Sequence, residues 1–237
     1  MHDSERQPDG AGQPPVTPAC FDCPAHRQAA FSDLRGATAG ACPFERVTLE
    51  QRAPIPDDWR DVYALGLVRR GVLVRQRVDR AGCAIAVDAA GPGCLIPFGP
   101  TGGALGVRGY AATRVLVCLL RTEVLQRALA TLDSTAPDLL RLQREALERV
   151  ELIAHARGRA CVDERVAALL VALSDTLAPP RLAAPIPSGL QQRDMAALLG
   201  VRHESVCRTL RKLERQGVIE RDADGIRILD RDALETV

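Results

Sequence analysis

Residues 190–229 decide the fold, and they read LQQRDMAALLGVRHESVCRTLRKLERQGVIERDADGIRIL. Six apolar residues recur there at the 3.6-residue spacing of an amphipathic helix, in two short runs separated by Gly200. They are Met195, Leu198, Leu199, Val206, Leu210 and Leu213. A glycine has no Cβ and suits the tight turn between two helices, so the pattern predicts a helix-turn-helix.

A β-hairpin is expected directly after the second helix. Residues 218–221 and 226–229 are short β-prone runs, and residues 222–225 between them contain the Asp-Gly pair typical of hairpin turns. The unit is therefore predicted to be a winged helix-turn-helix. Gln191 and Arg202 stand where Ser or Thr usually caps a helix, a loss of about 1 kcal/mol each unless Ser188 or packing compensates.

The sequence GVRHESVCRTL at 200–210, with GVIE at 217–220, resembles the DNA-binding domain of the Crp/Fnr superfamily of bacterial regulators. In that family a Glu and an Arg four residues later read bases, and they match Glu204 and Arg208 here. A carboxylate can accept from cytosine N4, and a guanidinium can donate to guanine O6 and N7. The alternative is an ordinary surface ion pair, which stabilises a helix by about 0.2–0.5 kcal/mol. The resemblance implies DNA contacts from Gln192, Arg193, Arg202, His203, Glu204, Cys207 and Arg208.

Composition limits the classes of protein to consider. At 237 residues and 46% hydrophobic content, the chain can form one large or two modest domains. A net charge of +1 does not by itself indicate a nucleic-acid partner. However, residues 181–215 contain seven basic residues (181, 193, 202, 208, 211, 212, 215) and three acidic ones (194, 204, 214). This local basic excess suits a regulator whose DNA-binding part is one of two domains.

The N-terminal segment and the apolar runs predict the location of the protein. Residues 1–19 are polar and rich in Pro and Gly, without the basic start and apolar run of a signal peptide, so we expect a disordered tail. No run approaches the 18 apolar residues of a membrane span, so we expect a cytoplasmic protein. In that compartment, eight cysteines indicate thiols or metal ligands rather than disulfides.

Short apolar runs separated by Gly and Pro occupy residues 47–120 and predict an all-β sandwich or roll. This part resembles the cyclic-nucleotide-binding β-roll of the superfamily. The Glu and Arg that hold a cyclic nucleotide in that family are missing, because residues 93–96 (GCLI) and 111–114 (AATR) stand in their places. We therefore expect no cyclic nucleotide.

Four cysteines are candidates for a metal site. Cys20 and Cys23 form a CxxC pair, a spacing that lets two thiolates face one metal or cluster. Their segment resembles the N-terminal cysteine segment of the oxygen-sensing Fnr branch, which implies a [4Fe-4S] cluster. Phe31 falls near the usual place of the third ligand, which leaves Cys42 as the nearby candidate, and Cys118 matches the distant fourth ligand. Alternatively, Cys118 is a small apolar residue on a buried strand.

Other functions for the cysteines and histidines stay open. The cluster could be replaced by thiol oxidation, for example at Cys207, whose sulfur would lie near DNA phosphates. A CxxC thiol oxidoreductase is a more remote alternative, since the βαβ context of such enzymes is missing. Cys83, Cys94 and Cys161 are expected to fill space, and His26 and His155 are isolated. No enzyme active site is implied.

Residues 137–156 predict a long helix. Five apolar side chains form a narrow stripe along it, namely Leu139, Leu142, Ala146, Val150 and Ile153. Such a stripe can pack on its own β-roll. In the superfamily this helix forms the dimer coiled coil, and a two-fold DNA reader needs a two-fold contact.

Together these features predict an α+β fold in four parts. They are a disordered tail (1–19), a sensor β-roll with the cysteine segment (20–136), a dimerisation helix (137–160) and a winged helix-turn-helix domain (161–237). The predicted function is a homodimeric transcriptional regulator of Crp/Fnr type that senses oxygen or redox state. Its expected partners are double-stranded DNA with inverted-repeat half-sites and RNA polymerase.

Overall fold

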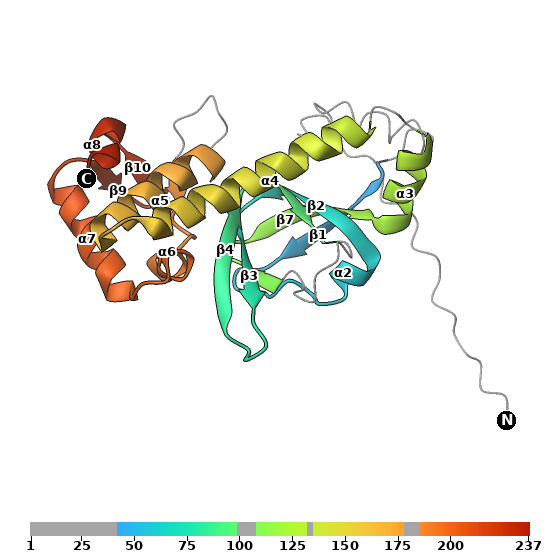
Figure 1. Cartoon of the computed structure of the whole chain (residues 1–237), viewed down its shortest axis with the longest axis horizontal. Helices are drawn as coiled ribbons and strands as arrows, with labels where there is room; N and C mark the ends of the chain where they lie inside the picture. Colours follow the sequence, from blue (N-terminus) through green and yellow to red (C-terminus); the bar gives the residue numbers. More distant parts are fainter. Residues whose placement is uncertain (1–41, 99–107, 132–134, 178–184) are drawn as a thin grey trace.

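The computed structural model describes residues 42–98, 108–131, 135–177 and 185–237. The tail predicted at 1–19, together with Cys20 and Cys23, lies outside the described residues. A β-roll comes first in the described chain, a long helix follows, and a helical unit with a small sheet completes it (Figure 1). This is the predicted α+β fold.

Two antiparallel sheets form the roll. Their strands are β1 (Phe44–Leu49), β2 (Tyr63–Arg70), β3 (Leu73–Val78), β4 (Ala84–Ala90), β5 (Leu95–Pro97), β6 (Arg108–Ala111) and β7 (Val115–Arg121). One sheet has the order β1-β7-β2-β5 and the other β4-β3-β6. A short helix, α2 (Trp59–Val62), precedes β2 and buries Trp59 edge-on against Phe98 in the roll core. The strand β1 completes the first sheet by pairing with β7, and β6 completes the second by pairing with β3.

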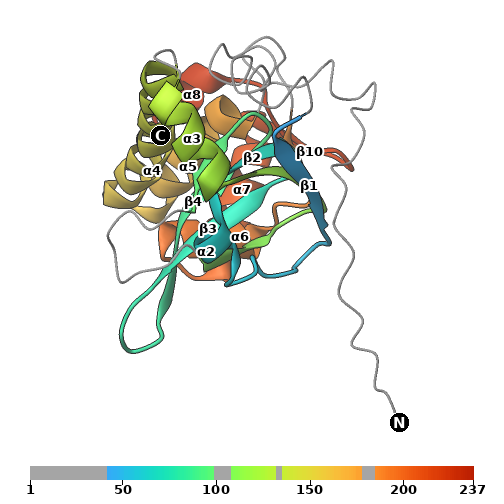
Figure 2. The ribbon, with the colours of Figure 1, turned by 90° about the vertical axis from the view of Figure 1, so that its right-hand side faces the viewer.

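Three helices follow the roll. They are α3 (Thr122–Thr131), α4 (Thr135–Gly158) and α5 (Val162–Leu177). The helix α4 extends two residues beyond the predicted segment at each end. It runs along the roll from α3 to the C-terminal helices, and a view along the long axis of the molecule places α3, α4 and α5 on one side of the strands (Figures 1 and 2).

The apolar stripe predicted as a dimer seam is largely the face that α4 packs on its own chain. Leu142 is buried in one cluster with strands of the roll, and Ile153 is buried in a second cluster with α5. Ala146 is also buried, whereas Val150 is half-buried. The prediction of the seam was therefore wrong for Leu142, Ala146 and Ile153, since the apolar period alone cannot say which neighbour a helix face meets.

The buried face of α4 also carries a charge. Arg149 lies between the apolar residues of that face, and its Nη2 is 3.3 Å from Oδ2 of the buried Asp88 on β4. The same Nη2 donates to the carbonyl of Leu95 at 3.0 Å, and Arg75 on β3 pairs with Asp88 at 2.9 Å. Because a buried charge is costly unless it is paired and hydrogen-bonded, this group fixes α4 against the roll.

The C-terminal unit contains β8 (Ile186–Pro187), α6 (Gln192–Leu199), α7 (His203–Arg215), β9 (Ile219–Arg221), β10 (Gly225–Ile228) and α8 (Arg231–Glu235). A single apolar cluster runs from β3 and β4 of the roll through α5 into α6 and α7. The helix-turn-helix therefore packs against the roll, in addition to being joined to it by the polypeptide chain. Among the described helices, none is both long and apolar enough to cross a membrane.

Candidate nucleic-acid interface

The helix-turn-helix forms where the sequence predicts it. The helix α6 ends at Gly200, which has φ of 66° and donates its N–H to the carbonyl of Ala196. This left-handed C-cap suits glycine because glycine has no Cβ. The helix α7 then begins at His203. All six apolar residues used for the prediction are buried between α5, α6 and α7: Met195, Leu198, Leu199, Val206, Leu210 and Leu213.

The opposite face of α7 is open to solvent. His203, Glu204 and Arg208 are exposed near its N-terminal end, and Cys207 is half-buried. The surface ion pair considered as an alternative is not formed within the described chain, where no ion pair joins Glu204 to Arg208. Both side chains are therefore open to solvent near the N-terminal end of α7.

Acidic residues near the two helices are held by cations. Asp163 on α5 accepts from Lys212 Nζ and from Thr209 Oγ1, each at 2.5 Å. These bonds, that of Lys212 first, hold the pKa of Asp163 below its ordinary value. Glu214 pairs with Arg221 of the wing, and this pairing lowers the pKa of Glu214. Asp163 and Glu214 are thus paired with cations, whereas Glu204 and Arg208 stay exposed near the start of α7.

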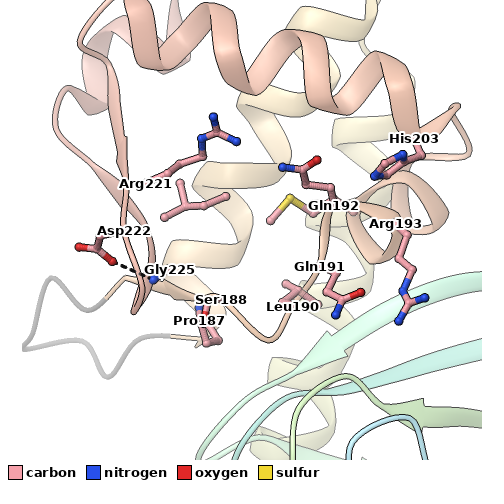
Figure 3. Close-up of a pocket in the computed structure, with 12 residues that line it drawn as sticks. Pro187, Ser188, Leu190, Gln191, Gln192, Arg193, His203, Arg221, Asp222 and Gly225 are labelled. Carbon is pink, nitrogen blue, oxygen red and sulfur yellow. Dashed lines mark hydrogen bonds between the residues drawn. The ribbon is translucent and has the colours of Figure 1, made fainter.

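A cavity of about 410 Å³ lies between α6, the start of α7 and the wing (Figure 3). Among its lining residues are Ser188, Gln192, Arg193, His203, Arg221 and Asp222. These residues lie in the segment before α6, at the starts of α6 and α7, and in the wing. In helix-turn-helix proteins the second helix lies in the major groove and the first crosses the backbone. The lining supplies hydroxyl, amide and guanidinium donors, the groups that most often contact phosphates.

Cys207 is in contact with both helices of the motif. Its thiol donates to Gln192 Oε1 on α6, and its sulfur lies 3.4 Å from His203 Nε2 one turn earlier on α7. The structure therefore brings together three of the residues predicted to contact DNA. Gln192 is half-buried, Arg193 and Arg202 are exposed, and the seven predicted residues lie at the α6 start, at the N-cap of α7 or along α7.

The wing has a strand that the sequence did not reveal. The hairpin β9–β10 forms at the predicted Asp-Gly turn, with Asp222 Oδ1 accepting from the backbone N–H of Gly225 at 3.0 Å (Figure 3). In addition, β8 pairs with β10, so the sheet order is β8-β10-β9. A two-residue strand gives no alternating pattern, and β8 therefore left no signal in the sequence.

The N-terminus of α6 is capped by a residue within the helix. The backbone N–H of Gln191 donates to Asp194 Oδ2 at 2.8 Å, which is the reciprocal half of a capping box. Asp194 thus compensates for the missing Ser or Thr at this end. The N-cap of α7, Arg202, makes no side-chain cap hydrogen bond, as its residue type predicts.

Two of the four cysteines predicted as metal ligands are described. Cys118 is buried on β7, and Cys42 packs against the same apolar cluster. Within residues 42–98, 108–131, 135–177 and 185–237, the structure has no group of three His, Cys, Asp or Glu side chains that could hold a metal ion. Cys94 is half-buried, its sulfur is 3.6 Å from the carbonyl of Thr176, and burial raises the pKa of its thiol. Cys83 and Cys161 are exposed, so the expectation that they fill space was wrong.

Comparison with known proteins agrees with this geometry. Residues 164–237 match the family of Crp-like helix-turn-helix domains. A stretch of 78 residues is 44% identical to the transcriptional activatory protein AadR of Rhodopseudomonas palustris, and it spans 31% of each chain. The match therefore covers about a third of that relative.

Solved structures resemble a larger part of the chain. FixK2 from Bradyrhizobium japonicum superposes with a TM-score of 0.68 at 21% identity, covering 81% of this chain and 96% of that one. A cyclic nucleotide-binding domain containing protein from Listeria monocytogenes gives a TM-score of 0.68 at 11% identity, covering 86% and 97%. Residues 164–237 thus belong to the family of Crp-like helix-turn-helix domains, and the chain shares the fold of these two solved structures.

Proposed function

We propose that the protein is a homodimeric transcriptional regulator of Crp/Fnr type that binds inverted-repeat DNA. The single observation that carries the proposal is the exposed pair Glu204 and Arg208 on α7, in a domain that matches the Crp-like family. Glu204 reads cytosine N4, and Arg208 reads guanine O6 and N7. Gln192, Arg193, Arg202 and His203 contact the phosphates and flanking bases, and their positions at the α6 start and the α7 start support this role.

The dimer seam that we propose lies on the outer side of α4. Leu140, Leu147 and Ala154 recur every seven residues and are exposed, which is the spacing of a coiled-coil seam. Leu140 is 66% exposed, although it is a large apolar residue in the second turn of α4. A second copy related by a two-fold axis would cover this row and would place two recognition helices on the same side of a duplex.

Selection from a pool of random duplexes tests the DNA-binding proposal. The protein is expected to enrich a two-fold inverted repeat, with half-sites about one helical turn apart. Glu204→Ala is the matched variant, since it should enrich a repeat in which one cytosine position has become random. A pool that remains unenriched after repeated rounds with folded wild-type protein overturns the proposal.

We also propose that the sensor is an iron-sulfur cluster bound by Cys20, Cys23, Cys42 and Cys118. Support comes from one apolar cluster that contains Cys118 and Leu142. Cys42 and Leu139 pack against this cluster, so both cysteines share an apolar environment with the first turns of α4. Thiolates are the usual ligands of such clusters, and four of them complete a cubane. When bound, the cluster would supply a redox-sensitive group at this end of the roll.

Anaerobic reconstitution with iron and sulfide tests the cluster. The cubane requires about four irons per chain, and Cys118→Ser should lose them. Cys83→Ser is the control, because Cys83 is exposed in the turn between β3 and β4 and its loss should leave the iron content unchanged. Protein that stays colourless and iron-free after reconstitution rules the cluster out.

A second candidate sensor is the thiol of Cys207. His203 Nε2 lies close enough to accept the thiol proton, and the thiolate is the form that peroxide oxidises. A sulfenic acid there would enlarge the side chain beside Gln192 at the proposed DNA face. Peroxide should then weaken DNA binding by wild-type protein and leave Cys207→Ser unaffected. Equal responses of both proteins exclude this sensor.

The roll gives no support to a cyclic-nucleotide ligand, and we propose that it binds none. Arg114 stands where the family carries its phosphate-binding Arg, but its side chain is 73% exposed and pairs with Glu50 at 3.1 Å on the surface. The hydroxyl of Thr113 accepts from the backbone N–H of Val72. Calorimetric titration with cyclic AMP and cyclic GMP should give no heat of binding at this site.

A further inference from the structure

The first helix of the helix-turn-helix is held by the β-roll at its start. Arg52, in the loop after β1, donates from its two terminal nitrogens to Asp194 Oδ1 and Oδ2 at 2.7 and 3.0 Å. The hydroxyl of Tyr110 on β6 donates to the same Oδ1 at 2.7 Å. The two roll residues thus bind one carboxylate of α6, and the guanidinium of Arg52 also lies 5.4 Å from the Tyr110 ring centroid.

Asp194 cannot leave this site without a large penalty. Its side chain is 1% exposed, and its two oxygens accept four hydrogen bonds, the fourth from the backbone N–H of Gln191. A bidentate guanidinium with further donors is the arrangement that makes a buried carboxylate stable. Separation of α6 from the roll would break three of these four hydrogen bonds, including both charge-assisted bonds from Arg52. The contact between Asp194 and the roll is therefore a stable, buried ion pair and not a transient surface one.

The backbone of Arg52 supports the same conclusion. Its φ is 71°, and within the described part of the chain it is the one residue other than glycine with positive φ. Its backbone N–H donates to the carbonyl of Ala111 at 2.7 Å, which anchors this conformation to the roll. Residues in such conformations persist where the surrounding contacts fix them, and they gather at functional contacts.

The other end of α6 is held by the long helix. Arg157, in the last turn of α4, donates to the carbonyl of Leu198 at the C-terminus of α6 and to the carbonyl of Ala86 on β4. The last carbonyls of a helix have no partner within it, so a guanidinium that binds one fixes the helix end. The helix α6 is thus held at its start by Arg52 and Tyr110 and at its end by Arg157. We call these three residues the α6 clamp.

We propose that the α6 clamp sets the distance between half-sites that the protein accepts in DNA. The inference rests on the proposed function, because it needs a dimer formed by α4 and a base-reading α7. The clamp ties α6 to α4 and to the roll, and α7 packs directly on α6. The separation and relative angle of the two recognition helices are therefore fixed by the dimer helix. One base pair more between half-sites turns the second one by about 35° around the duplex, which a clamped domain cannot follow.

Inverted repeats that differ by one base pair in spacer length test the proposal. The duplexes carry the half-site obtained by selection, and a duplex with one half-site serves as reference. Arg52→Gln and Tyr110→Phe loosen the clamp, and Arg114→Gln is the control, because Arg114 pairs with Glu50 within the roll. Dissociation constants are measured by fluorescence anisotropy, with thermal unfolding of every variant.

The readout is the ratio of the dissociation constants for the wrong and the right spacer. Loosening the clamp should lower this ratio by about fivefold, the effect of one net hydrogen bond, while affinity for the single half-site stays unchanged. Arg114→Gln should behave as wild type. Tyr110→Phe keeps the test decisive if Arg52→Gln fails to fold, because it removes one hydroxyl only.

Three outcomes overturn the proposal. In the first, the ratio stays at the wild-type value in both clamp variants. In the second, both variants bind every duplex more weakly by the same factor, the single half-site included, which is the result expected of a merely structural role. In the third, Arg114→Gln changes the ratio as much as the clamp variants do. Wild-type protein that binds none of the duplexes overturns the proposed function itself, and this result is distinct from the other three.

Discussion

Leu142 and Leu147 lie on opposite sides of α4, and their exposure differs accordingly. Leu142 is 1% exposed in the core of the roll, whereas Leu147 is 57% exposed, five residues along the same helix. A five-residue step turns an α-helix by about 140°, so both faces can be apolar without contact between them. The inner face packs on this chain, and the outer face is the surface where we propose the dimer contact.

Leu147→Glu is therefore expected to give monomers. A carboxylate in the middle of the row formed by Leu140, Leu147 and Ala154 would be buried without a partner at the two-fold contact. Leu152→Glu is the control, because Leu152 is a partly exposed leucine on a different side of α4. Sedimentation velocity should find monomers for the first variant and dimers for the second. A dimeric Leu147→Glu would place the contact elsewhere.

Gly225→Ala is expected to disrupt the wing. A Cβ at Gly225 would lie 1.8 Å from the carbonyl oxygen of Ile186, and its φ of 148° is unfavourable for other residues. We expect a loss of about 2–4 kcal/mol in the free energy of unfolding, because β8 must separate from β10. Gly217→Ala is the control, since its φ is also positive but a Cβ there meets no atom within 4 Å. Urea unfolding should show the smaller loss for Gly217→Ala.

Asp163 should make stability depend on acid pH. Hydrogen bonds from Lys212 and Thr209 hold its pKa below the ordinary value, so the folded state binds a proton there less readily than the unfolded chain. This contribution is complete above the unfolded pKa and is lost as the pH falls through the folded one. The stability difference between wild type and Asp163→Asn should thus be present at pH 7 and shrink below pH 4. A difference that grows on acidification would contradict the assignment.

The sequence predicted the helix-turn-helix well because its signals are local. Periodic leucines, a glycine at the turn and an Asp-Gly hairpin each act within a few residues, and the structure confirms all three. The contacts that fix the domain are not local. Arg52 and Asp194 are 142 positions apart, and the sequence around a loop arginine does not indicate which residue it will pair with.

The face of α4 could not be predicted for a different reason. Both of its sides carry leucines, and the buried side includes Arg149, which a hydrophobic pattern assigns to solvent. Its partner Asp88 lies on a strand 61 positions earlier. The sequence therefore predicts that α4 is amphipathic, but the roll decides which leucines remain for a partner.

Binding of Arg208→Ala to specific and random duplexes tests the central claim most directly. Arg208→Ala should cost about 1–3 kcal/mol on the selected inverted repeat and much less on random DNA, because a base contact is lost and few phosphate contacts change. Arg193→Ala is the control, since a phosphate contact at the start of α6 should weaken both duplexes alike. Equal losses for Arg208→Ala on the two duplexes would contradict base reading by α7.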